Sequence, residues 1–236
     1  MFAWNLRYPD ASAFDNMILW AGAIAGPVVL PGTYAVRINV NGQSFTQPLT
    51  VVKDPRSTAT DADLKEQFDF LMRIRDKTSQ ANDAVKTIRN MKAQLADREK
   101  KMTGDQATTF SRVAGDLSNR LSAIESEIYQ VKNQSGQDPL NYPIRLNNKI
   151  AALAGVVGGT DAKPTSQSYT VFDDLSFQLD RQLSTMRGTF IVVLPAINAT
   201  LKTAGLPAII PSTDEIRTPP NRAPAVSGSD DNEDNK

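Results

Sequence analysis

The part of the chain richest in side chains that can bind a ligand lies between residues 132 and 148. Amides, a guanidinium group and a phenol occur there together beside the predicted start of a helix, and such groups can hold a sugar or a peptide carboxylate. The members of this polar cluster are Lys132, Asn133, Gln134, Gln137, Asp138, Asn141, Tyr142, Arg145, Asn147 and Asn148. The candidate binding residues among them are Asp138, Asn141, Tyr142, Arg145 and Asn148.

The polar cluster also has a structural interpretation, which we favour. A loop that crosses the end of a helical bundle can use these side chains to satisfy its buried backbone groups. On that interpretation, replacing Asn141 and Arg145 together should melt the bundle. A stable double variant that has lost a ligand would favour binding instead.

Neighbouring carboxylates such as Asp173 and Asp174, or Glu125 and Glu127, raise the possibility of glycoside hydrolysis. That reaction needs two opposed carboxyl groups about 5 to 9.5 Å apart across a cleft. Adjacent positions on a helix do not face each other, so these pairs are ordinary charges on a solvated helix face. We therefore predict no catalytic residue and no enzymatic activity.

Four aromatic residues near the N-terminus could stack on a carbohydrate: Trp4, Tyr8, Trp20 and Tyr34. Aromatic residues at alternating positions of strands are more often part of a sheet core. We therefore expect these rings to be buried in a sheet.

The composition excludes several classes of function. The 236 residues include neither cysteine nor histidine, which removes disulfides, most zinc chemistry and the usual serine and cysteine hydrolase arrangements. The terminal acidic residues lack the Asp-x-Asp-x-Asp-Gly pattern of a calcium loop, so we predict neither a metal site nor a cofactor. Lysine plus arginine equals aspartate plus glutamate, 26 each, so no net charge draws the chain to nucleic acid.

The hydropathy pattern contains no membrane span and no signal peptide. No apolar run reaches the roughly 18 to 20 residues that a spanning helix needs. Met1 leads directly into FAWNLR, without a basic region followed by an apolar one. Taken literally, the sequence predicts a soluble, cytoplasmic protein.

A long helix, predicted for residues 60–102, is the element around which the rest is organised. Apolar side chains recur there in steps of three and four, from Leu64 to Met102, which is typical of one buried stripe. Thr60 with Asp63 has the spacing of a capping box, and Gly104 follows the last apolar residue. Such a helix is about 60 Å long, so it must lie along partner helices.

Three further helices are predicted to cover this stripe. The first covers residues 105–133 and folds back as an antiparallel hairpin. The second is short, begins with Asn141 as its cap and Pro143 in its first turn, and stops at Gly158. The third begins after Pro164 and runs to about residue 204, with Pro195 expected to bend or break it.

Residues 2–56 are predicted to form about four strands. The clearest element is a hairpin whose strands flank Asn41-Gly42, because both residues tolerate the positive φ of a type I′ turn. The fold class is therefore α+β: a partial Ig-like antiparallel β unit in residues 1–57, then an antiparallel bundle of three long helices and one short helix in residues 58–206. Residues 207–236 have the composition of a disordered acidic tail.

Several stretches resemble one family of proteins. They are WNLRYPDA at residues 4–11, MILWAG at 17–22 followed by Gly26-Pro27, PGTY at 31–34 and, most specifically, QVKNQSGQDPLNYPIRLNNK at 130–149. These resemble the C-terminal region of large secreted bacterial proteins that carry sortilin-like β-propellers of BNR/WD40-type repeats and are often labelled glycosyl hydrolase. The hairpin also looks like the Ig-like domain of flagellar hook-capping proteins.

The resemblance implies a non-enzymatic accessory module that makes protein–protein contacts or holds an upstream β-propeller, outside the cell or in the periplasm. Propeller repeats and a signal peptide are lacking here, so we expect a fragment of a longer protein. The alternative is an accessory region of a secreted glycosyl hydrolase or sialidase-like enzyme, with possible carbohydrate binding and catalytic groups elsewhere. A third possibility is a homo-oligomer, because the exposed edge of a sheet invites strand addition.

Overall fold

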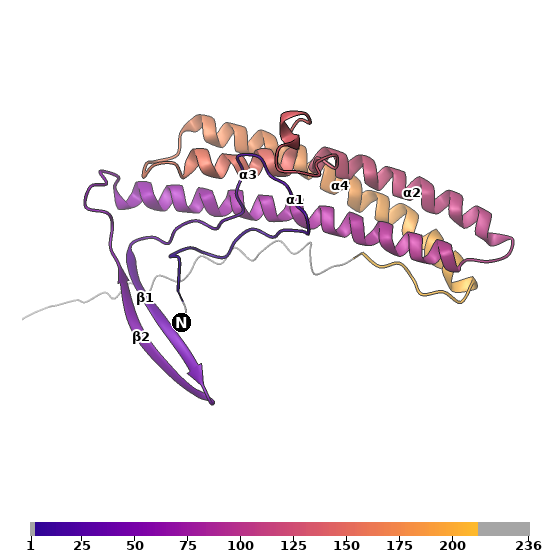
Figure 1. Cartoon of the computed structure of the whole chain (residues 1–236), viewed down its shortest axis with the longest axis horizontal. Helices are drawn as coiled ribbons and strands as arrows, with labels where there is room; N and C mark the ends of the chain where they lie inside the picture. Colours follow the sequence, from indigo (N-terminus) through magenta and orange to yellow (C-terminus); the bar gives the residue numbers. More distant parts are fainter. Residues whose placement is uncertain (1–2, 212–236) are drawn as a thin grey trace, which may run out of the picture.

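The computed structural model describes residues 3–211 and confirms an α+β fold with three long helices and one short helix (Figure 1). Two strands, β1 (Gly32–Val40) and β2 (Gln43–Val51), precede the helices. The helices are α1 (Asp61–Lys101), α2 (Gln106–Ile128), α3 (Leu146–Val157) and α4 (Ser166–Thr203), with one 3-10 turn, η1 (Asp138–Leu140), between α2 and α3.

The start of α1 is fixed by the predicted capping box. The Thr60 hydroxyl accepts a hydrogen bond from the Asp63 amide at 3.1 Å, and the Asp63 carboxylate accepts one from the Thr60 amide at 3.0 Å. Two of the unpaired amides at a helix start are satisfied in this way. With 41 residues, α1 is about 60 Å long and spans the whole bundle.

The helices form a rod in which α2 and α3 lie end to end along α1, and α4 runs beside them (Figure 1). Contacts along α1 run in one order, from its C-terminal end to its N-terminal end: Glu99 with Ser111 and Arg89 with Glu125 in α2, then Asn82 with Asn147 and Gln67 with the carbonyl of Val157 in α3. The rod is therefore three helices thick on both sides of the α2–α3 break.

The predicted apolar stripes meet inside this rod. Ile74, Val85, Ile88 and Met91 of α1 are fully buried, as are Leu121 of α2, Ile150 of α3 and Leu179 of α4. Phe68 and Phe190 are buried as well. Burial of apolar area is the main stabilising term in such a bundle.

Two predicted helix boundaries are wrong. α2 ends at Ile128, five residues early, because the buried Tyr129 turns away in an extended conformation and packs edge-to-face on Phe14 at 4.9 Å. Val131, which lies within the segment predicted to be helical, is 48% exposed. α3 begins at Leu146 with Arg145 as its N-cap. Asn141 instead ends η1, and a proline such as Pro143 disfavours a helical conformation for the residue before it.

The predicted hairpin is confirmed, including its two-residue turn. Val40 pairs with Gln43, and the turn residues Asn41 and Gly42 have φ of 49° and 80°. The expectation of about four strands is wrong. Within residues 3–31, only an isolated bridge between Arg7 and Val28 has strand pairing.

We call residues 3–31 the N-terminal strap. Apart from the bridge between Arg7 and Val28, the strap lies along the helices and not in a sheet. The Ser12 hydroxyl donates to Asp83 of α1 at 2.5 Å, and the Ile18 amide donates to the hydroxyl of Tyr129 at 3.1 Å. These side-chain contacts hold the strap to the helices. Its two halves are joined to each other by backbone hydrogen bonds from the amides of Tyr8, Ala11 and Val29 to the carbonyls of Pro27, Ile24 and Leu6. The strap therefore packs over the region where α2 and α3 are interrupted.

The C-terminal helix begins at its predicted cap, since the Thr165 hydroxyl accepts from the Ser168 amide at 3.2 Å. Pro195 lies inside α4 without ending it, so of the two expected outcomes, a bend or a break, the break is wrong. Leu194 and Ile197 are buried on either side of the proline, and their packing offsets the lost backbone bond. Beyond α4, Ile209 is buried and held by Asn198; the rest of the predicted acidic tail, from residue 212, lies outside the described residues.

Candidate functional site

The polar cluster predicted as a binding site lies midway along the rod rather than at its end. It occupies the loop of residues 129–145, which rises from the bundle between α2 and α3 (Figure 1). The structure divides its five candidate residues into two groups. Asp138, Asn141, Tyr142 and Arg145 belong to the loop and its exit, whereas Asn148 is buried inside α3.

Asp138 organises the loop itself. Its carboxylate accepts hydrogen bonds from the Gln134 amide at 2.6 Å, the Ser135 amide at 2.9 Å and the Ser135 hydroxyl at 3.0 Å. The bonds from the Gln134 and Ser135 amides lower the pKa of Asp138 below its ordinary value. The acceptor capacity of this carboxylate is therefore used within its own loop.

Replacing Asp138 with alanine should loosen this loop and leave the rod intact. Because the folded-state pKa is lowered, the contribution of Asp138 is present above the unfolded pKa of about 3.9 and is lost as the pH falls through the lower folded value. We expect amide exchange at Gln134 and Ser135, followed by NMR, to speed up in Asp138→Ala. The matched variant Asp116→Ala, at an exposed position of α2, should leave the exchange rates of both amides unchanged. Slow exchange of both amides in both variants would contradict the role of Asp138 in holding the loop.

Asn148 holds the N-terminal strap. Its Oδ1 accepts from the Trp20 amide at 2.7 Å, and its Nδ2 donates to the Trp20 carbonyl at 2.7 Å. One side-chain amide thus pairs with both backbone groups of one strap residue, as a neighbouring strand would. Asn148 therefore fixes the strap to α3, and we call this pair of hydrogen bonds the Asn148 clamp.

Next to this clamp, a buried polar network crosses from α3 to α1 and on to the strap. Asn147 Nδ2 donates to Asn82 Oδ1 at 3.1 Å, and Asn82 Nδ2 donates to the Ser12 carbonyl at 2.7 Å. Asn82 and Asn147 are almost completely inaccessible. Sequence reasoning did not single out Asn82, although an asparagine within an apolar helix stripe is a usable signal.

The exposed part of the cluster is smaller. Tyr142 is partly exposed, with Lys132 Nζ 5.5 Å from its ring centroid, and Asn141 is exposed. The Arg145 guanidinium lies 3.8 Å from Glu127, and its Nε is buried without a hydrogen-bond partner among residues 3–211. These three residues remain the members of the predicted site that can face a ligand.

The four aromatic residues do not form a sheet core. Tyr8 packs against Phe68 of α1 with ring centroids 5.0 Å apart, and Trp20 is 38% exposed on the strap. Trp4 and Tyr34 form an edge-to-face pair at 5.8 Å where the strap passes the hairpin. The prediction of a sheet core fails because, in the part of the chain that the structure describes, the hairpin has no second layer of strands to cover it.

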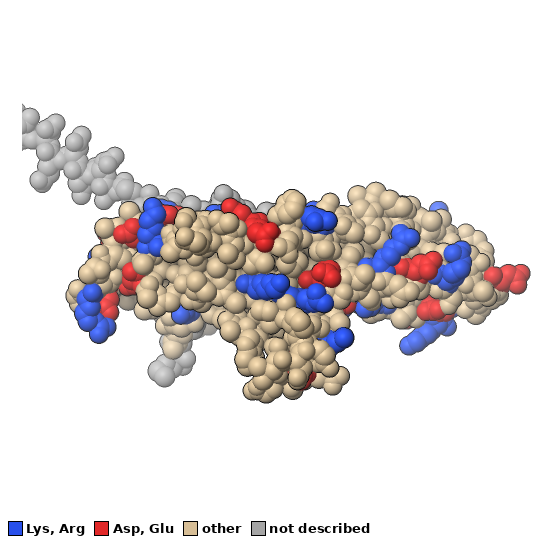
Figure 2. All heavy atoms as spheres, turned by 90° about the horizontal axis from the view of Figure 1, so that it is seen from above, with Lys and Arg blue, Asp and Glu red and all other residues tan. Residues whose placement is uncertain are grey.

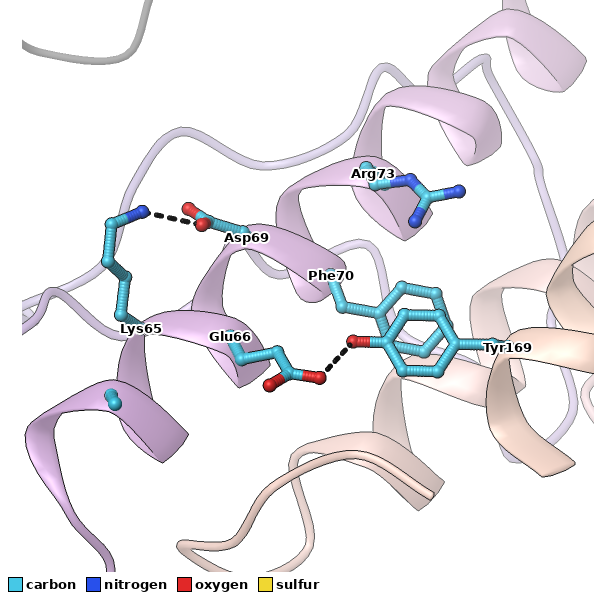
Figure 3. A pocket seen from close by; sticks show the side chains of 7 residues that line it. Lys65, Glu66, Asp69, Phe70, Arg73 and Tyr169 are labelled. Atoms are coloured by element: carbon cyan, nitrogen blue, oxygen red, sulfur yellow. Dashed lines mark hydrogen bonds and ion pairs between the residues drawn. The ribbon is translucent and has the colours of Figure 1, made fainter. Parts of the chain in front are cut away.

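A hollow of about 280 Å³ lies where the first turns of α1 and α4 meet (Figure 3). It is lined by Ala62, Lys65, Glu66, Asp69, Phe70, Arg73 and Tyr169. Lys65 Nζ pairs with Asp69 at 2.6 Å, and the Tyr169 hydroxyl donates to Glu66 at 3.1 Å. Nothing in the order of the chain places Tyr169 beside these charged residues of α1, which lie about 100 residues earlier.

The side chains that line this hollow join α1 to α4. Burial raises the pKa of Tyr169, and its hydrogen bond to Glu66 adds to the increase, so the phenol stays protonated at neutral pH. Its ring stacks at 4.2 Å on Phe70, while Arg73 lies 4.9 Å from the ring centroid of Phe172. The polar groups drawn in Figure 3 are thus engaged with one another or with rings.

The hairpin is amphipathic, and within residues 3–211 neither of its faces is covered by a helix or a second layer of strands; on the apolar face, Trp4 packs only against Tyr34. Cross-strand pairing puts Tyr34 beside Leu49 and Ile38 beside Phe45 on one side of the sheet. We define the apolar hairpin face as Tyr34, Val36, Ile38, Val40, Phe45 and Leu49. Ile38 is 57% exposed and Phe45 56% exposed. The opposite face carries Thr33, Arg37, Asn39, Ser44, Thr46 and Thr50.

The charges elsewhere are mixed. On the side of the molecule seen in Figure 2, lysine and arginine alternate with aspartate and glutamate along the rod. Within residues 3–211, no group of three metal-ligating side chains comes together, and none of the helices is both long enough and apolar enough to cross a membrane.

Comparisons of the chain with models of known protein families, with curated proteins and with solved structures found no match. The resemblance to sortilin-like β-propeller proteins therefore stays a prediction from the sequence. The geometry of the apolar hairpin face carries the functional argument.

Proposed function

We propose that this chain is a non-enzymatic interaction module in which the helical rod presents the β-hairpin to another protein or to another domain. The observation that carries the proposal is the exposure of the apolar hairpin face. The hairpin projects from the end of the rod at which α1 begins (Figure 1). Contiguous exposed apolar surface of this kind marks contact sites for proteins.

The energetics of a hairpin support the same proposal. A two-stranded hairpin alone is at best marginally stable in water, and it needs further strands or a packing partner to be stable. Here the strands are nine residues long, and the rod lies to one side of them (Figure 1). A protein surface that covers Val36, Ile38 and Phe45 would supply the missing layer.

The rod suits the role of a support. Its helices pack over their whole length around a continuous core, and α1 connects to β2 through only nine residues, 52–60. An upstream β-propeller, which the sequence resemblance implies, is one domain that such a module would hold. An extracellular or periplasmic location belongs to the same proposal.

Site-specific photo-crosslinking in the organism that makes the protein would test the contact. A photoreactive phenylalanine replacing Phe45 lies on the apolar hairpin face, and the matched probe at Asn39 lies near the same turn on the opposite face. We expect a defined adduct from position 45 and little from position 39. The adduct should fall several-fold when Ile38→Thr is added, because the contact is apolar.

Two outcomes of the crosslinking experiment would contradict the proposal. Equal adducts from positions 39 and 45 would mean that the hairpin is merely accessible. The absence of an adduct from position 45 would contradict the proposed contact. Mass spectrometry of the adduct identifies the partner, including a second copy of this chain.

A further inference from the structure

We infer that a second copy of this chain pairs with the outer edge of β1, so that two hairpins form one four-stranded antiparallel sheet. The inference rests on the proposed function, because it builds on the hairpin as the contact element. It further specifies which edge of the hairpin makes the contact, the register of the paired strands and the molecule that binds there.

The two edges of the hairpin are not equivalent. In a two-residue hairpin the pair that flanks the turn, here Val40 and Gln43, exchanges both backbone hydrogen bonds, and the pairs then alternate. Pro48, opposite Ala35, is therefore at a position whose backbone faces outward. Since proline has no amide hydrogen, the outer edge of β2 lacks a donor in the middle of the strand.

The outer edge of β1 has a complete set of backbone groups. By the same alternation, the amides and carbonyls of Thr33, Ala35, Arg37 and Asn39 point outward. Within residues 3–211, β1 has no strand neighbour other than β2. This edge is the one that can accept a further strand.

The strand β1 is complementary to itself in one register. When two copies pair antiparallel about Val36, all nine residues overlap and the outward-facing positions meet: Thr33 opposite Asn39 and Ala35 opposite Arg37 of the second copy. Arg37 then lies opposite alanine rather than another arginine, which avoids a like-charge pair. Moving the symmetry centre by one residue to Arg37 would put the two arginines directly opposite.

The same register joins the two apolar hairpin faces. Val36 lies beside Val36 of the second copy, and Tyr34 lies beside Ile38, all on one side of the sheet. Pairing of the edges thus makes a wider apolar surface for a protein partner. It also supplies the additional strands that a lone hairpin needs for stability.

A disulfide test reads the register directly, since the chain has no cysteine of its own. Val36→Cys puts the two sulfhydryls at the centre of symmetry, where paired Cα atoms are about 4.5 Å apart, within disulfide range. In the matched variant Ile38→Cys, the two positions are about 13 Å apart along the strands. We expect mild oxidation to convert most Val36→Cys chains to a dimer of twice 25.7 kDa and few Ile38→Cys chains.

A proline scan tests which edge is used without cysteines. Ala35→Pro removes an outward amide of β1, and the control Thr46→Pro removes one from β2; neither breaks a bond inside the hairpin. In sedimentation velocity at rising concentration, we expect the unmodified chain and Thr46→Pro to dimerise and Ala35→Pro to stay monomeric. Unchanged helical circular dichroism in all three would show that the rod is folded.

The outcomes separate this inference from the proposed function. Equal oxidation of Val36→Cys and Ile38→Cys, or a chain that is monomeric at every concentration, would overturn pairing of two copies. If position 45 nevertheless gives an adduct with a different protein, the contact role of the hairpin stands and only its occupant changes. If position 45 gives no adduct while Val36→Cys dimerises, the edge pairing stands and the apolar face has no further partner.

Discussion

Leu121→Ala is expected to lower the free energy of unfolding by about 3 kcal/mol. Leu121 is completely buried in α2 and belongs to the core that the long helices share. Removing its branched side chain costs the transfer free energy of the lost carbons and leaves a cavity that the surrounding helices fill only partly. Urea denaturation followed by circular dichroism measures the change.

The matched control for this prediction is Phe177→Ala on α4. This ring is larger than the leucine side chain but is 63% exposed, so its removal should change the free energy of unfolding by no more than about 0.5 kcal/mol. A loss at Phe177 that equals the loss at Leu121 would mean that the two helix faces have been assigned wrongly. It would also remove the basis for treating the rod as a rigid support.

The helices and the hairpin could be predicted because their signals are local. Thr60 and Thr165 lie within three residues of the amides that they cap, and the apolar stripes repeat within each helix. Asn41-Gly42 sets the turn by the φ angles that these two residues tolerate. None of these features depends on a distant part of the chain.

The N-terminal strap could not be predicted because its conformation depends on distant partners. The Ile18 amide binds Tyr129, and both backbone groups of Trp20 bind Asn148, more than 100 residues further along the chain. Alternating aromatic residues in the strap favour a strand on local grounds. Tertiary contacts with α1 and α3 override that preference.

The candidate site was predicted in composition but not in arrangement. The sequence indicates a polar segment between two helices, yet it does not indicate that these helices lie end to end against α1. Asn141, expected to cap a helix, is exposed, and Arg145 takes the cap position. The stability effect expected from replacing Asn141 and Arg145 therefore moves to the buried amides that bridge α1 and α3.

Asn82→Ala is expected to lower the free energy of unfolding by about 3 kcal/mol, although it removes only one small polar side chain. The change leaves the Ser12 carbonyl and Asn147 Nδ2 without their partner, and a buried unpaired group costs roughly 1 to 3 kcal/mol. Thermal and urea unfolding measure the loss. Asn90→Ala is the control on the same helix, because Asn90 is exposed and should cost at most about 0.5 kcal/mol.

A double-mutant cycle with Asn147→Ala separates lost packing from unpaired polar groups. If the cost arises from leaving one amide of the pair alone, the double variant should lose less than the sum of the two single losses, by about 1 kcal/mol or more. Strict additivity would show that the two side chains act independently. In that case apolar packing, and not the amide network, would stabilise the contact of α1 with α3 beside the α2–α3 break.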